Sequence, residues 1–179
     1  MGCLSSSQKE EDVSIALQSQ KKLKIVFIGL EGSGKTAILQ YLRNGKFTET
    51  QPTIGLNVET IQYKQRFYLI FDVGGKVRTL WSHYYDNLDG LVFVVDKIQK
   101  ELKKLSEDIK TKVINQLIQI VLLMYLNKSD LQNSQTMEFG DIPYSKSDVI
   151  IQKCSAKSGE GIWEGIDKMN GLLDQKFQS

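Results

Sequence analysis

The chain has 179 residues, 41% of them hydrophobic and 25% charged, which is typical of a single soluble globular domain. Its formal net charge of +2 argues against a nucleic-acid-binding surface, and we expect no nucleic-acid partner. The longest apolar run, at residues 118–126, is interrupted by Gln119 and predicts a buried strand instead of a membrane span. Cys3 and Cys154 give no disulfide framework and we find no secretory signal, so we expect a cytoplasmic protein.

Residues 1–20 are polar and rich in Ser, Gln and Glu, and we expect a flexible tail there, followed by one domain over residues 21–179. Residues 24–29 predict a short strand that ends at a glycine, and residues 35–45 predict a helix. Residues 56–63 and 66–72 predict two strands. The two residues between them are short enough for a hairpin.

Residues 91–96 and 120–126 are continuous apolar runs, which predict strands buried on both faces. Between them, apolar residues at helical spacing from Ile98 to Ile109 predict a helix. Residues 148–154 predict a last strand, and a closing helix follows it with one apolar face: Ile162, Ile166, Met169 and Leu173. Strands that alternate with helices predict an α/β fold with a mostly parallel sheet covered on both sides.

A phosphate-binding loop is predicted at residues 29–36, whose sequence GLEGSGKT matches GxxxxGK[ST] between a strand and a helix. Glycines let backbone N–H groups approach phosphate charge closely, and the following helix N-terminus adds its dipole. A glycine-rich turn with a chance match is the alternative, and the strand–helix context argues against it. The predicted phosphate ligands are Gly29, Glu31, Gly32, Ser33, Gly34, Lys35 and Thr36, with Thr36 also on Mg²⁺.

Guanine recognition is predicted from two short segments that follow the last two strands. In Asn127-Lys128-Ser129-Asp130 the final carboxylate would accept hydrogen bonds from N1–H and the 2-amino group of guanine, which adenine does not offer in that arrangement. Ser155-Ala156-Lys157 would present a backbone N–H to the base oxygen. Parallel strands bind ligands at their carboxyl ends, where both segments lie. The predicted guanine-binding residues are Asn127, Lys128, Asp130, Ser155, Ala156 and Lys157.

On these motifs the chain resembles the Arf/Arl family of small P-loop GTPases over about residues 22–177. Further marks are PTIGLNVET at 52–60, DVGG at 72–75, LWSHYY at 80–85 and CSAKSGEG at 154–161. The resemblance implies a six-stranded, mostly parallel sheet with helices on both faces, and GTP or GDP with Mg²⁺ as cofactors. It also implies that Thr53 meets Mg²⁺ and the γ-phosphate, that Asp72 supports Mg²⁺ through water, and that Gly75 contacts the γ-phosphate.

Leu56, Phe71 and Tyr84 fall where such proteins present an apolar patch to effectors. The alternative is that all three are ordinary core residues. His83, within the LWSHYY stretch, is expected to pack and not to act as a base.

The chain departs from the family after DVGG, where relatives carry a glutamine that orients the attacking water. Here Gly75 is followed by Lys76, and Trp81 comes two residues earlier than in the family pattern, so the glutamine is deleted. A charged lysine accepts no hydrogen bond from water. We therefore expect strong nucleotide binding with very slow hydrolysis, and we assign no catalytic residue. Either a partner supplies the missing group, or the protein stays in one nucleotide state.

The first residues, Met1-Gly2-Cys3-Leu4-Ser5-Ser6, fit the N-myristoylation pattern, with Gly2 as the acceptor and Cys3 as a site for a second chain. Two acyl chains hold a protein stably at a membrane, whereas one does so marginally. Residues 8–20 are too polar for a strong surface helix. We expect a peripheral membrane protein held by lipid, at Golgi, endosomal or ciliary membranes as is usual in the family.

The leading hypothesis is a membrane-anchored GTP-binding regulator that recruits effectors through its switch regions, with exchange factors and activating proteins as further partners. The alternative is a non-cycling pseudo-GTPase that serves as an adaptor or structural subunit of a larger assembly. A P-loop nucleotide kinase is disfavoured by NKSD and by the lack of an Arg-rich lid segment.

Overall fold

The computed structural model describes residues 22–76, 81, 83–84, 86–96, 120–131 and 149–178. Their elements follow one another as β1 (Leu23–Ile28), α2 (Lys35–Asn44), β2 (Leu56–Tyr63), β3 (Arg66–Val73), β4 (Gly90–Asp96), β5 (Val121–Asn127), β6 (Val149–Lys153) and α4 (Ile162–Gln178). Each predicted strand is found within one residue of its expected bounds. The predicted tail and the helix expected at 98–109 lie outside the described residues.

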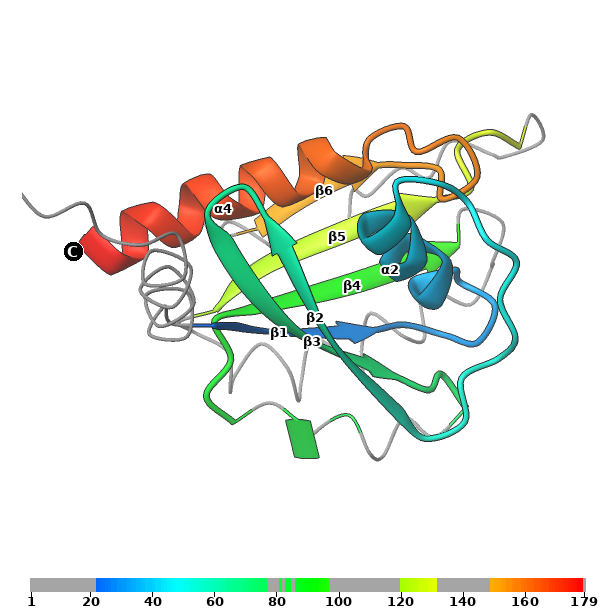
Figure 1. Ribbon diagram of the computed structural model, residues 1–179, viewed down its shortest axis with the longest axis horizontal. Coiled ribbons are helices and arrows are strands. Elements are labelled where there is room, and N and C mark those ends of the chain that lie inside the picture. The colour runs from blue at the N-terminus through cyan, green and yellow to red at the C-terminus, as the bar shows by residue number, and fades with distance from the viewer. Residues whose placement is uncertain are drawn as a thin grey trace, which may run out of the picture.

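The strands form one six-stranded sheet in the order β2-β3-β1-β4-β5-β6 (Figure 1). Every neighbouring pair is parallel except β2 and β3, which form the predicted hairpin. The six-stranded, mostly parallel sheet is confirmed. Because parallel strands end at the same edge, the segments that follow β1, β3, β4, β5 and β6 gather there, and so does the start of β2.

The sheet carries an apolar cluster on each face. Strands β4 and β5 are buried along their whole length, as their continuous apolar sequences predict. One face is covered by α2 and α4, whose buried side chains pack on β1, β4 and β5 (Figure 1). The other face holds a second cluster that includes Trp81 and Phe93. The predicted apolar face of α4 is confirmed, since Ile162, Ile166, Met169 and Leu173 are all buried.

Helix α2 is bounded by two glycines in the left-handed region. Gly34 has φ 92° at the N-terminus, and Gly45 has φ 68° at the C-terminus, where its N–H donates to the Tyr41 carbonyl at 2.8 Å. The buried side of the helix, which includes Ile38, Leu39 and Leu42, faces the sheet. The helix start is thereby fixed at the end of the phosphate-loop sequence. Among the described helices none is long and apolar enough to cross a membrane.

Candidate functional site

The loop between β1 and α2 requires glycine at both of its ends. Gly29 has φ 148°, and a β-carbon there would overlap the Val94 carbonyl of β4. Gly34 is left-handed, and its β-carbon would overlap the Asn127 side chain. The loop therefore lies directly against the ends of β4 and β5, which the glycines at the predicted positions permit.

The Lys35 side chain is hydrogen-bonded to the backbone of this loop. Its ammonium donates to the carbonyls of Gly29 at 2.9 Å and Leu30 at 3.0 Å, and the residue is only 5% exposed. Burial lowers the pKa of Lys35, and the negative charges of Asp72 and Glu31 oppose that shift. Nearby, the buried Ser33 hydroxyl has no hydrogen-bond partner. A buried cation and an unpaired hydroxyl on a glycine loop fit a bound phosphate group.

Thr36, Thr53 and Asp72 meet beside this loop, as the family resemblance implies. The Thr36 hydroxyl donates to Asp72 Oδ2 at 2.7 Å and lies 2.8 Å from the Thr53 hydroxyl. Thr53 Oγ1 is 3.3 Å from the same carboxylate oxygen. Asp72 is completely buried, and its Oδ1 has no partner. Burial raises the pKa of Asp72, while hydrogen bonds from Thr36 and Thr53 and the charge of Lys35 act to lower it.

These oxygens fit Mg²⁺, which prefers hard oxygen ligands and completes its shell with phosphates and water. The described residues contain no group of three or more His, Cys, Asp or Glu side chains that would hold a metal by themselves. Two hydroxyls and one carboxylate therefore suit a cation that arrives with a nucleotide, and not a free-standing metal site.

Asn127 contacts both the phosphate loop and the segment that follows β6. Its Nδ2 donates to the Ser33 carbonyl at 2.9 Å, and its Oδ1 accepts from the Ala156 N–H at 3.0 Å. Asn127, one of the predicted guanine-binding residues, thus connects the phosphate loop to the segment after β6 through two hydrogen bonds. The buried Cys154 lies against it, with Sγ 3.8 Å from Asn127 Oδ1. Burial raises the pKa of the Cys154 thiol to about 12.

The remaining predicted base-contacting residues lie together at the same sheet edge. The Ser155 hydroxyl donates to Asp130 Oδ1 at 2.6 Å and accepts from the Lys157 N–H at 3.2 Å. Lys128 has φ 64° and donates to Asp96 Oδ2 at 2.6 Å. Sequence reasoning missed Asp96, although its position at the carboxyl end of a buried strand was a usable signal.

A protein-family comparison identifies this arrangement. The model of the ADP-ribosylation factor family matches residues 10–173. The chain belongs to this family. A solved structure similar to it is the Arl6 BBS3 small GTPase from Trypanosoma brucei with bound nucleotide analogue GppNp, at 28% identity and a TM-score of 0.75. The match covers 87% of this chain and 99% of that one, so the Arf-like small-GTPase fold is confirmed.

In this Arf-family chain, Lys76 and the DVGG turn before it lie beside the phosphate loop. A β-carbon on Gly75 would overlap the backbone of Gly29, Leu30 and Glu31, so the DVGG turn lies directly on the loop. The next residue, Lys76, places Nζ 3.3 Å from Glu31 Oε1. Both side chains are largely solvent-exposed, which limits the strength of the pair. Lys76, the residue after the DVGG turn, therefore lies beside the phosphate loop.

The predicted effector trio is gathered on one side of the Arf-like sheet. Val58 is paired with Phe71 across the hairpin, so Leu56, two residues earlier, shares their face. The rings of Phe71 and Tyr84 are 6.3 Å apart, and both are half-buried against the second apolar cluster. Leu56 is exposed, whereas the two aromatics pack against the second apolar cluster, and the effector role of the three stays a prediction. Sequence reasoning missed the exposed Val58 and Ile54, the latter 97% exposed.

The predicted lipidation residues Gly2 and Cys3 lie outside the described residues. His83, described and exposed, has no place among the phosphate- and base-side residues set out above.

Proposed function

We propose that this chain is a Mg²⁺-dependent guanine-nucleotide-binding regulatory protein with slow or partner-dependent GTP hydrolysis. The observation that carries the proposal is the convergence of Thr36, Thr53 and Asp72 beside the buried Lys35. Lys35 and Asp72 are buried and the two threonines are half-buried, and each of these polar groups gains a partner when a Mg²⁺–phosphate group binds. The similar Arl6 BBS3 structure, which holds the nucleotide analogue GppNp, supports the same ligand class.

Different residues of the chain would bind the phosphate end and the base end of a nucleotide. Lys35 and the backbone N–H groups of the loop would hold the β- and γ-phosphates. Thr36 and Thr53 would offer hydroxyls to Mg²⁺, and Asp72 would support it through water. Bound Mg²⁺ would neutralise phosphate charge. At the other end, Asp130 would accept from guanine, with its carboxylate oriented by Ser155.

Slow hydrolysis follows from the residue after the DVGG turn. Efficient hydrolysis needs a group that accepts a hydrogen bond from the attacking water, and a charged lysine has no acceptor. Lys76 instead pairs with Glu31. In a cycling switch, an activating protein would supply the missing group.

A second candidate function is a non-cycling adaptor that keeps one nucleotide as a stabilising ligand. The Lys76–Glu31 pair favours it, because the pair closes the turn on the loop without offering hydrolytic chemistry. Both candidates predict nucleotide binding and differ in whether the bound nucleotide turns over.

Membrane anchorage through Gly2, with Cys3 as a second acylation site, belongs to the proposal on motif grounds. Effectors, exchange factors and activating proteins are the proposed protein partners. The exposed face of Leu56, Val58 and Ile54 supports an effector surface there. Golgi, endosomal or ciliary membranes are the proposed setting.

The test is a single-turnover assay on the purified full chain, with bound nucleotide identified by chromatography. A variant with Gln-Asp inserted after Gly75 restores the family's spacing, and an Ala-Ala insertion at the same place controls for length. We expect bound guanine nucleotide, hydrolysis that is negligible over hours, and recovery in the Gln-Asp variant alone. Rapid multiple-turnover hydrolysis by the unaltered chain would contradict slow hydrolysis, and absence of nucleotide binding would contradict the function itself.

A further inference from the structure

The segment that follows β6 forms a tight turn over residues 155–161. The Ser155 N–H donates to the Glu160 carbonyl at 2.9 Å, and the Gly159 N–H donates to the Ser155 carbonyl at 2.8 Å. Gly159 and Gly161 have φ 85° and 73°, in the left-handed region that glycine adopts without strain. The backbone of this segment, which we call the 155–161 turn, is thus held by its own hydrogen bonds.

Ser155 connects the 155–161 turn to Asp130, the residue predicted to accept hydrogen bonds from guanine. Its hydroxyl donates to Asp130 Oδ1 at 2.6 Å and accepts from the N–H groups of Lys157 and Ser158, both at 3.2 Å. Ser155 is completely buried, whereas Asp130 is exposed. An exposed aspartate side chain has several rotamers available, and this hydrogen bond favours one of them. The position of the turn therefore determines how the Asp130 carboxylate is oriented.

Tyr41 of α2 lies against the turn at Gly159. A β-carbon on Gly159 would overlap the outer end of the tyrosine side chain, at its hydroxyl oxygen, Cζ and Cε2. The ring thus fills the space that a side chain at residue 159 would need. Tyr41 is half-buried and also packs against the apolar cluster between the helices and the sheet. It therefore contacts both the core and the 155–161 turn.

The turn has a second point of attachment, on the side of the sheet. The Ala156 N–H donates to Asn127 Oδ1 at 3.0 Å, and Asn127 is itself bonded to the Ser33 carbonyl. Ala156 lies near the start of the turn and Gly159 near its end. The Tyr41 contact therefore limits movement of the end of the turn that the Asn127 hydrogen bonds do not reach.

Helix α2 relates the Tyr41 contact to the phosphate end of the site. The helix begins with Lys35 and Thr36, and Tyr41 follows Lys35 by about 9 Å along the helix axis. The buried side chains of α2 pack on the sheet, and a close-packed interface of this kind does not absorb a shift of the helix. Tyr41 therefore holds the 155–161 turn at a fixed position relative to the phosphate loop.

We propose that Tyr41 is a positioning residue for guanine selectivity, because its ring holds the 155–161 turn and thereby the orientation of the Asp130 carboxylate. The inference rests on the proposed function, since it concerns how the same site selects its base. Tyr41 is not itself one of the predicted phosphate- or base-binding residues. It acts on the base through Gly159 and Ser155.

The test compares the affinities of the purified full chain for GTP and for inosine triphosphate (ITP), measured in excess Mg²⁺ by competition with a fluorescent GDP analogue. ITP keeps the base oxygen and the N1–H of guanine and lacks only the 2-amino group. The ratio of the two dissociation constants therefore measures one hydrogen bond to Asp130. We expect the unaltered chain to bind GTP about tenfold or more tightly than ITP, the effect of one hydrogen bond to a charged group.

The main variant is Tyr41→Leu, which keeps an apolar side chain against the core and removes the outer ring atoms that contact Gly159. We expect its preference for GTP over ITP to fall by about threefold or more. Tyr41→Phe keeps Cζ and Cε2 and should retain most of the preference. Asn44→Ala, at an exposed position at the end of α2, is the matched control and should leave both affinities unchanged.

Gly159→Ala tests the same contact from the other side. Its β-carbon overlaps the tyrosine ring, so we expect a lower preference for GTP even with Tyr41 intact. In a chain that also carries Tyr41→Leu the overlap is relieved, and the effects of the two substitutions on the preference should be less than additive. If Tyr41→Leu does not fold, as judged by circular dichroism, Gly159→Ala alone decides, and an unchanged preference in it would overturn the inference.

Equal losses of GTP and ITP affinity in Tyr41→Leu would reduce Tyr41 to a structural role, and so would additive effects of the two substitutions. An unaltered chain that prefers GTP, with the same preference in Tyr41→Leu, would overturn this inference and leave the proposed function standing. If the unaltered chain binds no guanine nucleotide, or binds GTP no better than ITP, the proposed guanine recognition fails together with this inference.

Discussion

Asp72 and Lys35 are charged residues that the fold keeps almost entirely from water. Such groups are costly unless they are paired, and the structure pairs them only in part. Asp72 Oδ1 has no partner, and the Lys35 ammonium bonds to carbonyls and not directly to a carboxylate. Selection for stability alone favours apolar residues at such positions. These two charges therefore indicate a ligand that carries both positive and negative groups, as a Mg²⁺-bound phosphate does.

Substitution of Asp130 tests guanine recognition. Replacing Asp130 with Asn keeps the shape but presents a donor where guanine also donates. The amide keeps one acceptor oxygen, so one hydrogen bond to a charged group, contributing about 1.5–3 kcal/mol, would be lost. The two donors left facing each other would cost about 1–3 kcal/mol more. We expect GTP affinity to fall by about 100-fold or more, measured by equilibrium titration with a fluorescent analogue. Asp86→Asn, an exposed aspartate in the turn before β4, should leave affinity unchanged. Equal affinities for Asp130→Asn and the unaltered chain would place the base elsewhere.

The reactivity of the Cys154 thiol measures whether solvent reaches the guanine side of the site. In a Cys3→Ser background it is the one remaining cysteine of the chain. Its thiol is buried against Asn127, and its pKa is raised from 9.0 to about 12, so it stays protonated as pH rises from 7 to 9. We expect negligible alkylation by iodoacetamide across that pH range and complete alkylation in denaturant, followed by mass spectrometry. Fast labelling of the folded protein that increases with pH would contradict this burial.

At the scale of elements, the two ends of α2 offer a comparison. Gly34 and Gly45 are both left-handed, so alanine strains the backbone at either position. A β-carbon at Gly34 also overlaps the Asn127 side chain, whereas a β-carbon at Gly45 would meet open space. We expect both alanine variants to lose about 1 kcal/mol or more of stability, measured by denaturant unfolding. Only Gly34→Ala should also abolish nucleotide binding. Loss of binding in both variants would mean that helix strain alone disrupts the site.

Most of this architecture was predictable from local patterns. Apolar runs such as 91–96 identify strands because parallel strands are buried on both faces, and the two-residue turn at 64–65 identifies the hairpin. The phosphate loop was predictable because close approach of the backbone demands glycine at fixed positions. Its sequence therefore indicates both the fold and the ligand.

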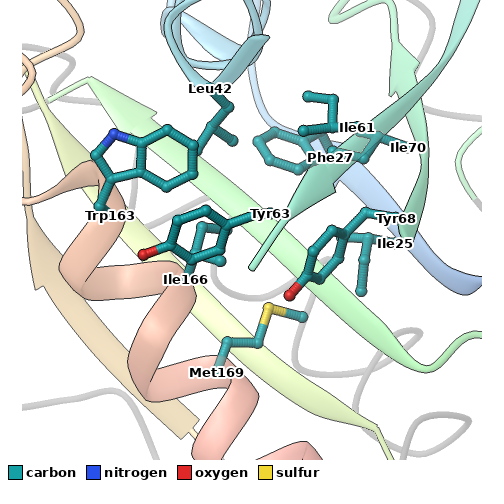
Figure 2. A pocket seen from close by; sticks show the side chains of 10 residues that line it. All are labelled: Ile25, Phe27, Leu42, Ile61, Tyr63, Tyr68, Ile70, Trp163, Ile166 and Met169. Carbon is teal, nitrogen blue, oxygen red and sulfur yellow. The ribbon is translucent and has the colours of Figure 1, made fainter. Parts of the chain in front are cut away.

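The contacts between distant segments were not predictable in this way. Asp167 and Asn170 of α4 look like ordinary solvated positions of an amphipathic helix. Nothing near them in sequence indicates that they contact Lys64 and Tyr68, the latter of which lies against α4 in Figure 2. Which polar side chains meet depends on how α4 crosses the sheet, and that is set by packing of its opposite, apolar face. The Lys76–Glu31 pair has the same origin, since it depends on how the DVGG turn settles on the phosphate loop.

For the molecule as a whole, the site joins segments from residue 29 to residue 157. Asn127 links the phosphate loop to the segment after β6, so a ligand that spans the site should stabilise the entire fold. Mg²⁺–GTP at 100 to 1,000 times its Kd adds about 2.7–4.1 kcal/mol. For a chain of this length, that corresponds to a rise in Tm of about 5–15 °C, measured by calorimetry.

EDTA should remove a large part of that rise, and Mg²⁺–ATP at the same concentration should leave Tm unchanged, because adenine lacks the donors that Asp130 accepts. Lys35→Ala provides the control, since it removes the buried cation of the phosphate loop and with it the response to any nucleotide. An equal rise with ATP and GTP would retain the phosphate site and contradict guanine recognition. No rise with either would show that the fold is complete without nucleotide, and that the buried charges of Lys35 and Asp72 are tolerated for another reason.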